Sequence, residues 1–399
     1  MSAGPFPGDG FRPPPYPYDR LAAIAAVAER HPGGMVDLSV GTPCDPPPSA
    51  VPSVLGASGA ERGYPTSAGA PAVKAAIGRW LARRFALHAG PEAMALCVGT
   101  KEFVASAAWY LRLHRPERDT VLAPAVAYPT YAMGAQLAGC RTVLVPARAD
   151  GAMDLDALDP DDAARAVVLW VNSPANPTGA LDDLEAAAAF GRAHDVPVVS
   201  DECYAEFCWE RRPPPTILQH GQDGVLALHS LSKRSNLAGL RVGCYVGDPA
   251  LVEYLSEVRK HAGLMVPGPV QAAAAVAWDD DDHVDEQRAR YRARLERLAA
   301  VLTEAGLEVR LPAGGFYLWV PVPAWAQEAG RAGGRAGAWV LTEALAEAGG
   351  ALVSPGEFYG EAGAGFVRIA VVQPEERIEL VAARLAEAGA SLGGGGVRR

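Results

Sequence analysis

Lys233 is the residue of this sequence whose type and neighbours most directly indicate covalent chemistry. It follows the apolar stretch Leu226–Leu228 and two hydroxyls, those of Ser230 and Ser232. A lysine that is partly desolvated beside other cations has a lowered pKa and can form a Schiff base with a carbonyl compound. Taken alone, the stretch also fits an ordinary loop lysine. The chain has only three other lysines, each in charged or polar sequence typical of surfaces: Lys74, Lys101 and Lys260.

A carboxylate, Asp201, stands at the end of another apolar run, Val196–Ser200. Such a group at a strand end can be a metal ligand, a binder of ribose hydroxyls or the partner of a protonated ring nitrogen. No companion His or Asp lies at metal-ligand spacing, which argues against a metal site. A carboxylate that pairs with a pyridinium makes the ring an electron sink, as carbanion chemistry requires.

Several polar groups suit a bound phosphate. Gly99 and Thr100 stand between an apolar strand and the start of a helix, where backbone N–H groups and a hydroxyl attract anions. Lys101 follows, either as part of that site or as a solvated lysine. Arg241 lies shortly after the lysine segment, and its guanidinium offers the bidentate geometry that matches a phosphate dianion.

Two further side chains indicate recognition of a polar ligand. Arg368 lies within the apolar stretch Phe366–Ala370. An arginine on a buried strand requires an anionic partner. The near-continuous apolar run 166–171 predicts a strand covered on both faces, and it delivers Asn176 to the end at which open α/β sheets bind ligands. An Asn-Pro-Thr-Gly turn without a ligand is the alternative.

Four segments together resemble the class I/II aminotransferases, which use pyridoxal phosphate (PLP) on the type I fold. They occur in the family's order over essentially the whole chain: Asn172–Gly179, Asp201–Tyr204, Ser230–Lys233 followed by Arg241, and Phe366–Ile369. The resemblance implies a large α/β domain with a mostly parallel sheet and a smaller α+β domain. We expect boundaries at 1–40 for the N-terminal arm and part of the small domain, 41–280 for the large PLP-binding domain, and 281–399 for the small C-terminal domain.

The resemblance also implies roles around the cofactor ring. Lys233 would form the Schiff base with PLP and, once freed, act as general base. Asp201 would pair with the ring nitrogen, while Tyr204 and Asn176 would hydrogen-bond the ring oxygen. Tyr128 would stack on the ring face, with Tyr131 as a packing residue.

Further roles follow from the same resemblance. The α-carboxylate of the substrate would bind Arg368, with Asn176 and the backbone N–H of Gly41. Tyr64 of the partner subunit would reach the phosphate across a homodimer. The other groups expected at the phosphate are Gly99, Thr100, Lys101, Ser230, Ser232 and Arg241.

Among these enzymes, the chain is most similar to actinobacterial N-succinyl-LL-diaminopimelate aminotransferases of lysine biosynthesis. Supporting segments are Val36–Pro43, Gly99–Glu102, Ala127–Tyr131, Arg259–Pro267 and Phe358–Gly360. The implied reaction exchanges an amino group between glutamate or 2-oxoglutarate and N-succinyl-LL-2-amino-6-oxopimelate. Alternatives are an aspartate, aromatic or specialised-metabolite aminotransferase, a PLP lyase or decarboxylase, and a non-catalytic binding protein of the same fold.

Composition agrees with such an enzyme. The 399 residues are 49% hydrophobic and 21% charged, which suits a globular chain with a large core. A formal charge of −10 without a basic run argues against nucleic acid and anionic membranes as partners. No membrane span or signal peptide is visible, and six scattered cysteines indicate buried, reduced thiols. We therefore expect a cytoplasmic enzyme. The sequence also predicts a helix over 71–85, a long helix over 284–304 and a flexible connection over 327–337.

Overall fold

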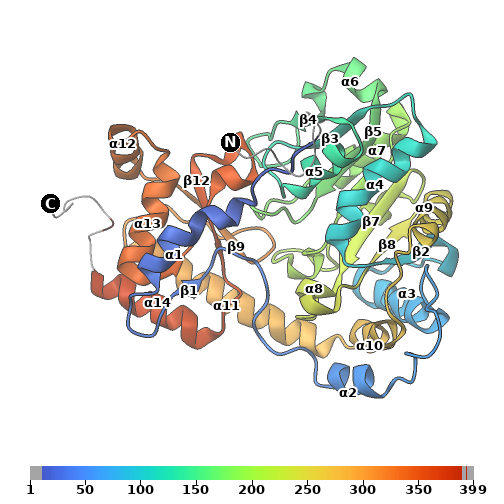
Figure 1. Cartoon of the computed structure of the whole chain (residues 1–399), viewed down its shortest axis with the longest axis horizontal. Helices are drawn as coiled ribbons and strands as arrows, with labels where there is room; N and C mark the ends of the chain where they lie inside the picture. The colour runs from blue at the N-terminus through green and yellow to red at the C-terminus, as the bar shows by residue number, and fades with distance from the viewer. Residues whose placement is uncertain (1–10, 389–391, 393–399) are drawn as a thin grey trace.

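The computed structural model describes residues 11–388 and Leu392. A seven-stranded sheet forms the larger part of the molecule, on the right of Figure 1. Its strand order is β2-β8-β7-β6-β5-β3-β4, and β8 is the one strand of this sheet that runs opposite to the other six. The mostly parallel sheet expected for the type I fold is confirmed. The strands are β2 (Met94–Cys97), β3 (Thr120–Pro124), β4 (Arg141–Val145), β5 (Ala166–Asn172), β6 (Val198–Asp201), β7 (Val225–Ser230) and β8 (Gly243–Gly247).

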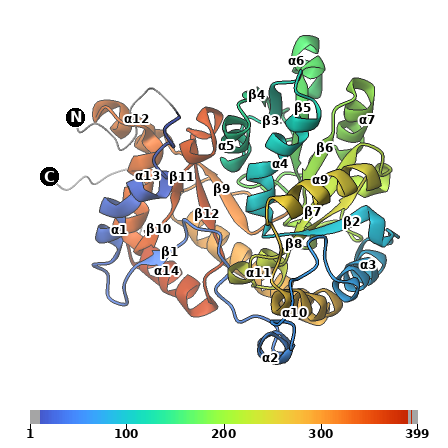
Figure 2. The same cartoon turned by 45° about the vertical axis from the view of Figure 1, so that its right-hand side comes forward.

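Helices cover both faces of this sheet because its strand residues are apolar on both sides. All seven residues of β5 are buried: Trp170 packs with α4, α5 and α9, whereas Leu169 and Val171 pack with α3, α7 and α10. Figure 2 shows α4 and α9 across one face. The helix expected over 71–85 is confirmed as α3. The helices of this part are α2 (Ala50–Ala57), α3 (Pro71–Phe85), α4 (Thr100–His114), α5 (Thr130–Leu137), α6 (Pro160–Ala164), α7 (Leu184–His194), α8 (Leu231–Arg234), α9 (Pro249–His261) and α10 (Gly268–Asp279).

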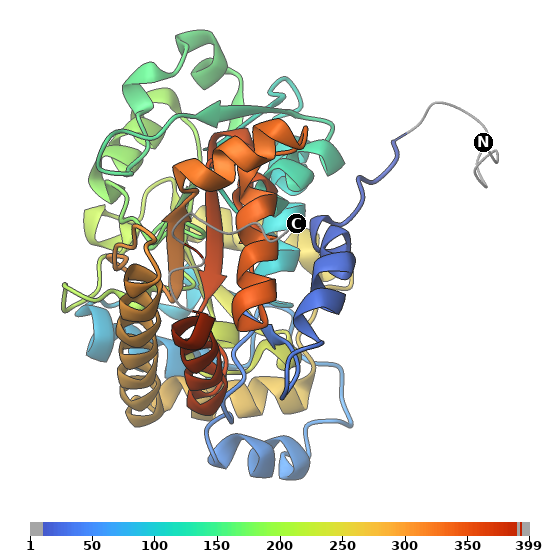
Figure 3. The ribbon, with the colours of Figure 1, turned by 90° about the vertical axis from the view of Figure 1, so that its left-hand side faces the viewer.

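The smaller part lies on the left of Figure 1 and faces the viewer in Figure 3. It joins the beginning of the described chain to its end, because β1 pairs in parallel with β10 and α1 packs on α13. A three-stranded antiparallel sheet, in the order β11-β12-β9, lies beside them. The elements are the short 3₁₀ helix η1 (Pro17–Leu21), α1 (Ala22–Ala28), β1 (Val36–Asp37), β9 (Tyr317–Pro321), α12 (Ala324–Ala332), α13 (Gly337–Gly349), β10 (Ala351–Leu352), β11 (Ser354–Pro355), β12 (Phe366–Ala370) and α14 (Glu375–Ala388).

One long helix, α11 (Asp282–Glu304), connects the two parts, as Figure 1 shows. Near its start, Asp285 forms an ion pair with Arg84 of α3, with an N–O distance of 2.9 Å. Further along, Leu295 and Leu298 join the hydrophobic core of the smaller part. The long helix expected over 284–304 is confirmed, with two more residues at its start.

The flexible connection expected over 327–337 is wrong for most of its length. Helix α12 continues to Ala332, and only a four-residue turn separates it from α13. Alanine favours helix, and the glycine content that suggested flexibility serves close packing instead. A Cβ atom on Gly330 would collide with the backbone of Arg335 and Gly337, so the turn folds tightly against the helix.

The cysteines are all free thiols, and the expectation of burial fails for Cys44 and holds only in part for Cys203, which is partly buried. Cys97, Cys140, Cys208 and Cys244 are buried, whereas Cys44 is exposed in the irregular segment after β1. Within residues 11–388, no three His, Cys, Asp or Glu side chains gather as ligands for a metal ion. None of the helices in this range is long and apolar enough to cross a membrane.

Candidate active site

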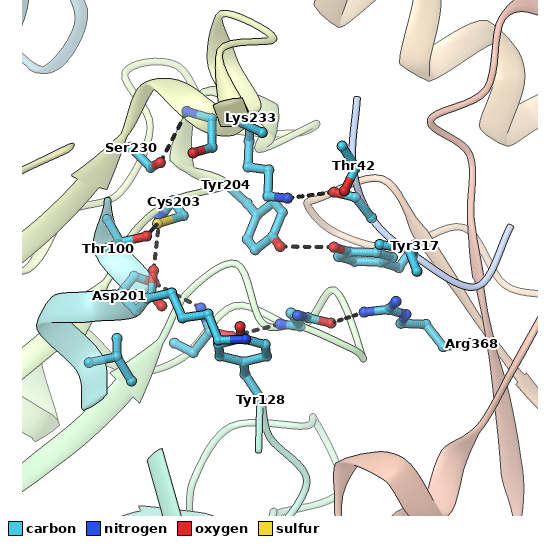
Figure 4. A pocket seen from close by; sticks show the side chains of 18 of the residues that line it. Thr42, Thr100, Tyr128, Asp201, Cys203, Tyr204, Ser230, Lys233, Tyr317 and Arg368 are labelled. Atoms are coloured by element: carbon cyan, nitrogen blue, oxygen red, sulfur yellow. Dashed lines mark hydrogen bonds between the residues drawn. The ribbon is translucent and has the colours of Figure 1, made fainter. Parts of the chain in front are cut away.

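A cavity of about 390 Å³ lies at the carboxyl ends of β5, β6 and β7, where the two parts of the molecule meet (Figure 4). Both parts contribute to its walls. Since parallel strands all end at one edge of a sheet, the polar residues that follow them converge there. The sequence-predicted residues that line the cavity are Gly41, Thr100, Lys101, Tyr128, Asn176, Asp201, Tyr204, Ser230, Ser232, Lys233, Arg241 and Arg368.

Lys233 is presented by α8, the single helical turn that follows β7. Ser230 caps this turn by accepting a hydrogen bond from the backbone N–H of Ser232 at 3.1 Å. The ammonium of Lys233 donates to the carbonyl of Gly41, and protein surrounds the side chain except where it faces the cavity. Burial lowers the pKa of Lys233 to about 8, with Arg368 nearby acting in the same direction. The amine is therefore neutral at a lower pH than that of a surface lysine.

Asp201 ends β6 and is buried across the cavity from Lys233. Its Oδ2 accepts a hydrogen bond from the hydroxyl of Tyr131 at 2.9 Å, and its Oδ1 accepts one from the backbone N–H of Cys203 at 3.2 Å. Burial raises the pKa of Asp201, and these two hydrogen bonds oppose the rise. A carboxylate held in this way is suited to pair with a cation brought in by a ligand.

Tyr131 does more than the packing that the sequence suggested. It stands in the first turn of α5, is fully enclosed and stacks on Trp170 of β5 with ring centroids 5.1 Å apart. Its hydroxyl fixes the Asp201 carboxylate. No local pattern shows this partnership, because the two residues are 70 positions apart. Tyr128, three residues earlier, faces the cavity as predicted.

The groups expected to hold phosphate gather at the start of α4. Gly99 is the N-cap of this helix with φ of +74°, a conformation that favours glycine, and Thr100 is its first residue. A Cβ atom on Gly99 would collide with the guanidinium of Arg241 in its present position, so a side chain here would displace that guanidinium from the helix start. The helix start, the guanidinium and the hydroxyls of Ser230 and Thr100 form a donor set that matches a phosphate dianion.

Lys101 and Tyr64 lie further from the centre. Lys101 is exposed at the rim of the cavity, with its ammonium 5.4 Å from the ring centroid of Tyr16 and 5.9 Å from that of Tyr128. Tyr64 does not line the cavity of its own chain and is 99% exposed. Its expected contact with a partner subunit stays a prediction.

Arg368 is a buried cation held by groups from several segments. It is 2% exposed and its guanidinium lies 4.2 Å and 4.7 Å from the ring centroids of Tyr317 and Tyr359. Nη1 donates to Oδ1 of Asn176 at 2.7 Å, and Nη2 donates to the hydroxyl of Tyr18 at 3.3 Å. Among the described residues, no carboxylate pairs with it and its Nε has no hydrogen-bond partner. A buried guanidinium without a carboxylate partner is suited to bind the anionic group of a ligand.

Tyr204 and Tyr317 were not expected to meet. Their hydroxyls lie 2.9 Å apart, and both side chains are buried. Burial raises the pKa of Tyr204 well above its ordinary value, so its hydroxyl stays protonated and can donate. Figure 4 shows the pair between Lys233 and Arg368. The sequence predicted Tyr204 from its motif, whereas Tyr317 belongs to β9 and carried no signal.

These groups define a site for a phosphorylated pyridine aldehyde. The phosphate-type donor set, the buried carboxylate and the low-pKa lysine match the phosphate, ring nitrogen and aldehyde of PLP respectively. The residues present therefore fit this cofactor.

Comparison with known proteins agrees. The family model for aminotransferase class I and II matches residues 33–385. The sequence is 41% identical over 380 residues to 4-dedimethylamino-4-oxo-anhydrotetracycline transaminase OxyQ of Streptomyces rimosus, covering 93% of this chain and 99% of that protein. It is 31% identical over 389 residues to an LL-diaminopimelate aminotransferase of Dehalococcoides mccartyi, covering 94% and 96%.

A solved structure gives the same result. The fold is similar to that of a probable N-succinyldiaminopimelate aminotransferase from Thermus thermophilus, with a TM-score of 0.77, 31% identity, and coverage of 93% of this chain and 99% of that chain. The chain belongs to the class I and II aminotransferases. This family depends on PLP, so the predicted family, fold type and cofactor are confirmed.

Proposed function

We propose that this aminotransferase exchanges an amino group between glutamate or 2-oxoglutarate and an oxo acid, N-succinyl-LL-2-amino-6-oxopimelate. The choice of a carboxylate-bearing substrate rests on the buried guanidinium of Arg368, which no carboxylate of the described residues neutralises. An α-carboxylate would supply that charge, accept the free Nε–H, and meet Asn176 and the backbone N–H of Gly41.

Each residue of the cofactor side has a role in this proposal. When bound, PLP withdraws electrons from the substrate carbon that loses its proton. The amine of Lys233 takes that proton from the α-carbon and returns one in the reverse half of the cycle. Asp201 stays ionised beside the ring nitrogen, Tyr204 and Asn176 donate toward the ring oxygen, and Tyr128 covers one face of the ring.

The phosphate end is the fixed anchor. Thr100 and Gly99 at the helix start, Arg241 and the serine hydroxyls would hold the dianion, with Lys101 at the rim. The chain would act as a homodimer in the cytoplasm, with Tyr64 of the partner subunit completing the phosphate site. We also propose domain boundaries at residues 40 and 280. They are supported by Val51 and Trp278 in a core cluster of the larger part and by Val36 and Tyr291 in that of the smaller part.

The acceptor rests on resemblance, since two relatives carry diaminopimelate in their names: the Thermus structure and the Dehalococcoides enzyme. A second candidate is an oxo acceptor with a flat ring system. It is supported by the 41% identity to OxyQ and by the tyrosines at the cavity rim, Tyr16, Tyr18 and Tyr128. Aromatic side chains in such positions favour stacking with a planar ligand.

A spectroscopic half-reaction tests both. The purified protein loaded with PLP is mixed in separate cuvettes with L-glutamate, N-succinyl-LL-diaminopimelate, and an amine on a planar ring. We expect the visible absorbance of the cofactor to be lost with the first two, and the matching oxo acids to form. If the absorbance is lost with glutamate alone, amino transfer stands but the proposed diaminopimelate-type acceptor is wrong. If it is lost with the ring amine, the second candidate is supported. Product formation from one amino acid without an oxo acid would identify a lyase.

A further inference from the structure

Tyr317 connects the two halves of the site through three contacts. Its hydroxyl lies 2.9 Å from that of Tyr204, its ring lies 4.2 Å from the guanidinium carbon of Arg368, and its hydroxyl fills the space that a Cβ atom on Gly41 would need. Gly41 in turn accepts the hydrogen bond from Lys233. The sheet fixes this position: in the register of β9 and β12, Tyr317 is opposite Ala370 and Trp319 is opposite Arg368. Tyr317 and Arg368 are therefore diagonal neighbours on one face.

The number of protons decides the direction of the bond between the two tyrosines. A tyrosine hydroxyl has one proton to donate and can also accept. If Tyr204 donates its proton to the ring oxygen of PLP, it has none left for Tyr317. Both side chains are buried, at 6% and 1% exposure, so bulk water does not replace the partner. With cofactor in place, Tyr317 must then be the donor and Tyr204 the acceptor.

We propose that Tyr317 is a further positioning residue of this enzyme, which donates to Tyr204 and so strengthens the donation of Tyr204 to the cofactor's ring oxygen. The proposal rests on the proposed function, because it takes the role of Tyr204 from there. Donation to a hydroxyl polarises it and makes it a better donor. Tyr317 also lies against Arg368, on the neighbouring strand of the same small sheet. The sheet that carries the proposed carboxylate-binding arginine therefore also holds the tyrosine that acts, through Tyr204, on the ring oxygen.

The test measures the pH at which the visible absorbance of the PLP-loaded protein changes. When the nitrogen of Lys233 loses its proton, negative charge falls on the ring oxygen, and donors to that oxygen favour this state. Tyr317→Phe removes the donor but keeps the ring on Arg368, so the midpoint is expected to rise by about half a pH unit. Tyr359→Phe is the matched control: its ring also lies on Arg368, at 4.7 Å, while its hydroxyl bonds to Tyr18 rather than Tyr204. Its midpoint should equal that of the unaltered protein.

A double-mutant cycle separates positioning from a general structural effect. In a Tyr204→Phe background, Tyr317→Phe is expected to leave the midpoint unchanged. An equal midpoint for Tyr317→Phe and the unaltered protein, or the same shift with and without Tyr204, would overturn the proposal. If Tyr317→Phe does not fold, a fluorinated tyrosine at 317, whose hydroxyl is a stronger donor, is expected to lower the midpoint instead, and an unchanged midpoint would overturn the proposal. Absence of any visible cofactor band in the unaltered protein would count against the proposed function itself.

Discussion

The two halves of the active site are built in different ways. On the proposed cofactor side, Asp201 and Ser230 are the last residues of strands of one sheet, and Lys233 follows within one helical turn. On the proposed substrate side, Arg368 takes its contacts from five separate segments: Tyr18, Ser39, Asn176, Tyr317 and Tyr359. The first half is fixed by the sheet, whereas the second depends on how the two parts of the molecule meet. Substrate choice can therefore change by alterations that leave the cofactor site intact.

The largest expected effect comes from a substitution that disables only the proposed cofactor half of the site. Lys233→Ala removes the proton-transferring amine, so amino transfer should fall at least about 10³-fold. The phosphate contacts remain, and the protein should still bind PLP with altered visible absorbance. Lys260→Ala, on the surface beside Glu257, is the control and should have normal activity. A Lys233→Ala protein with more than a small fraction of normal turnover would contradict the assigned role.

Breaking the substrate half should give a different signature. Arg368→Lys keeps the charge but loses the bidentate geometry and the contact with two rings, so KM for glutamate should rise by about 10- to 100-fold. The cofactor's absorbance and affinity should not change. Arg297→Lys, whose guanidinium pairs with Glu379 at the surface, is the control. If the Arg368→Ala protein still bound carboxylate substrates tightly, the assignment of Arg368 as the group that binds the α-carboxylate would be wrong.

The pH dependence of cofactor capture tests the environment of Lys233. The amine reacts with an aldehyde only when neutral, and its pKa is lowered to about 8. The rate at which cofactor-free protein takes up PLP should therefore rise about tenfold between pH 7 and pH 9 and then level off. A surface lysine, with its higher pKa, gives about a 100-fold rise with no plateau. Stopped-flow mixing, with N-acetyl-lysine as the reference amine, distinguishes the two.

The smallest expected effects come from removing two tyrosine hydroxyls, one in each half of the site. Tyr131→Phe removes one hydrogen bond to Asp201 and should weaken PLP binding about fivefold with little change in KM. Tyr18→Phe removes a longer bond to Arg368 and should raise KM about two- to fivefold with unchanged PLP affinity. For both variants, fluorescence titration measures the affinity for PLP and steady-state kinetics measure KM. Exchanged phenotypes would mean that the two halves are not independent.

Sequence reasoning could predict the residues of the proposed cofactor half because its signals are local. An apolar run followed by a polar turn predicts a buried strand with its functional group at the end, as at Asn176, Asp201 and Lys233. The structure brings these groups to one cavity, and helices also lie where the sequence predicted them, over 71–85 and, from a charge-rich periodicity, over 284–304.

The partnerships between distant segments were not predictable in this way. Tyr131 with Asp201 and Tyr204 with Tyr317 are separated by 70 and 113 positions, and nothing in the neighbouring sequence encodes the partner. The misread stretch over 327–337 has a different cause. Its glycines were taken as a sign of flexibility, whereas the fold uses Gly330 to let α12 approach the following turn.

The contact between Gly41 and Tyr317 has a consequence for how such chains diversify. A methyl group at position 41 and a phenolic hydroxyl at position 317 cannot occupy the same space. The ring atoms Cζ and Cε1 of Tyr317 are also too close to such a methyl group, at 2.8 and 2.9 Å. A lineage can therefore acquire a side chain at 41 only if the aromatic ring at 317 is replaced first or the loop moves, although the two residues lie 276 positions apart in the sequence. Among homologues, we expect these two columns of an alignment to covary, with glycine at 41 wherever tyrosine stands at 317.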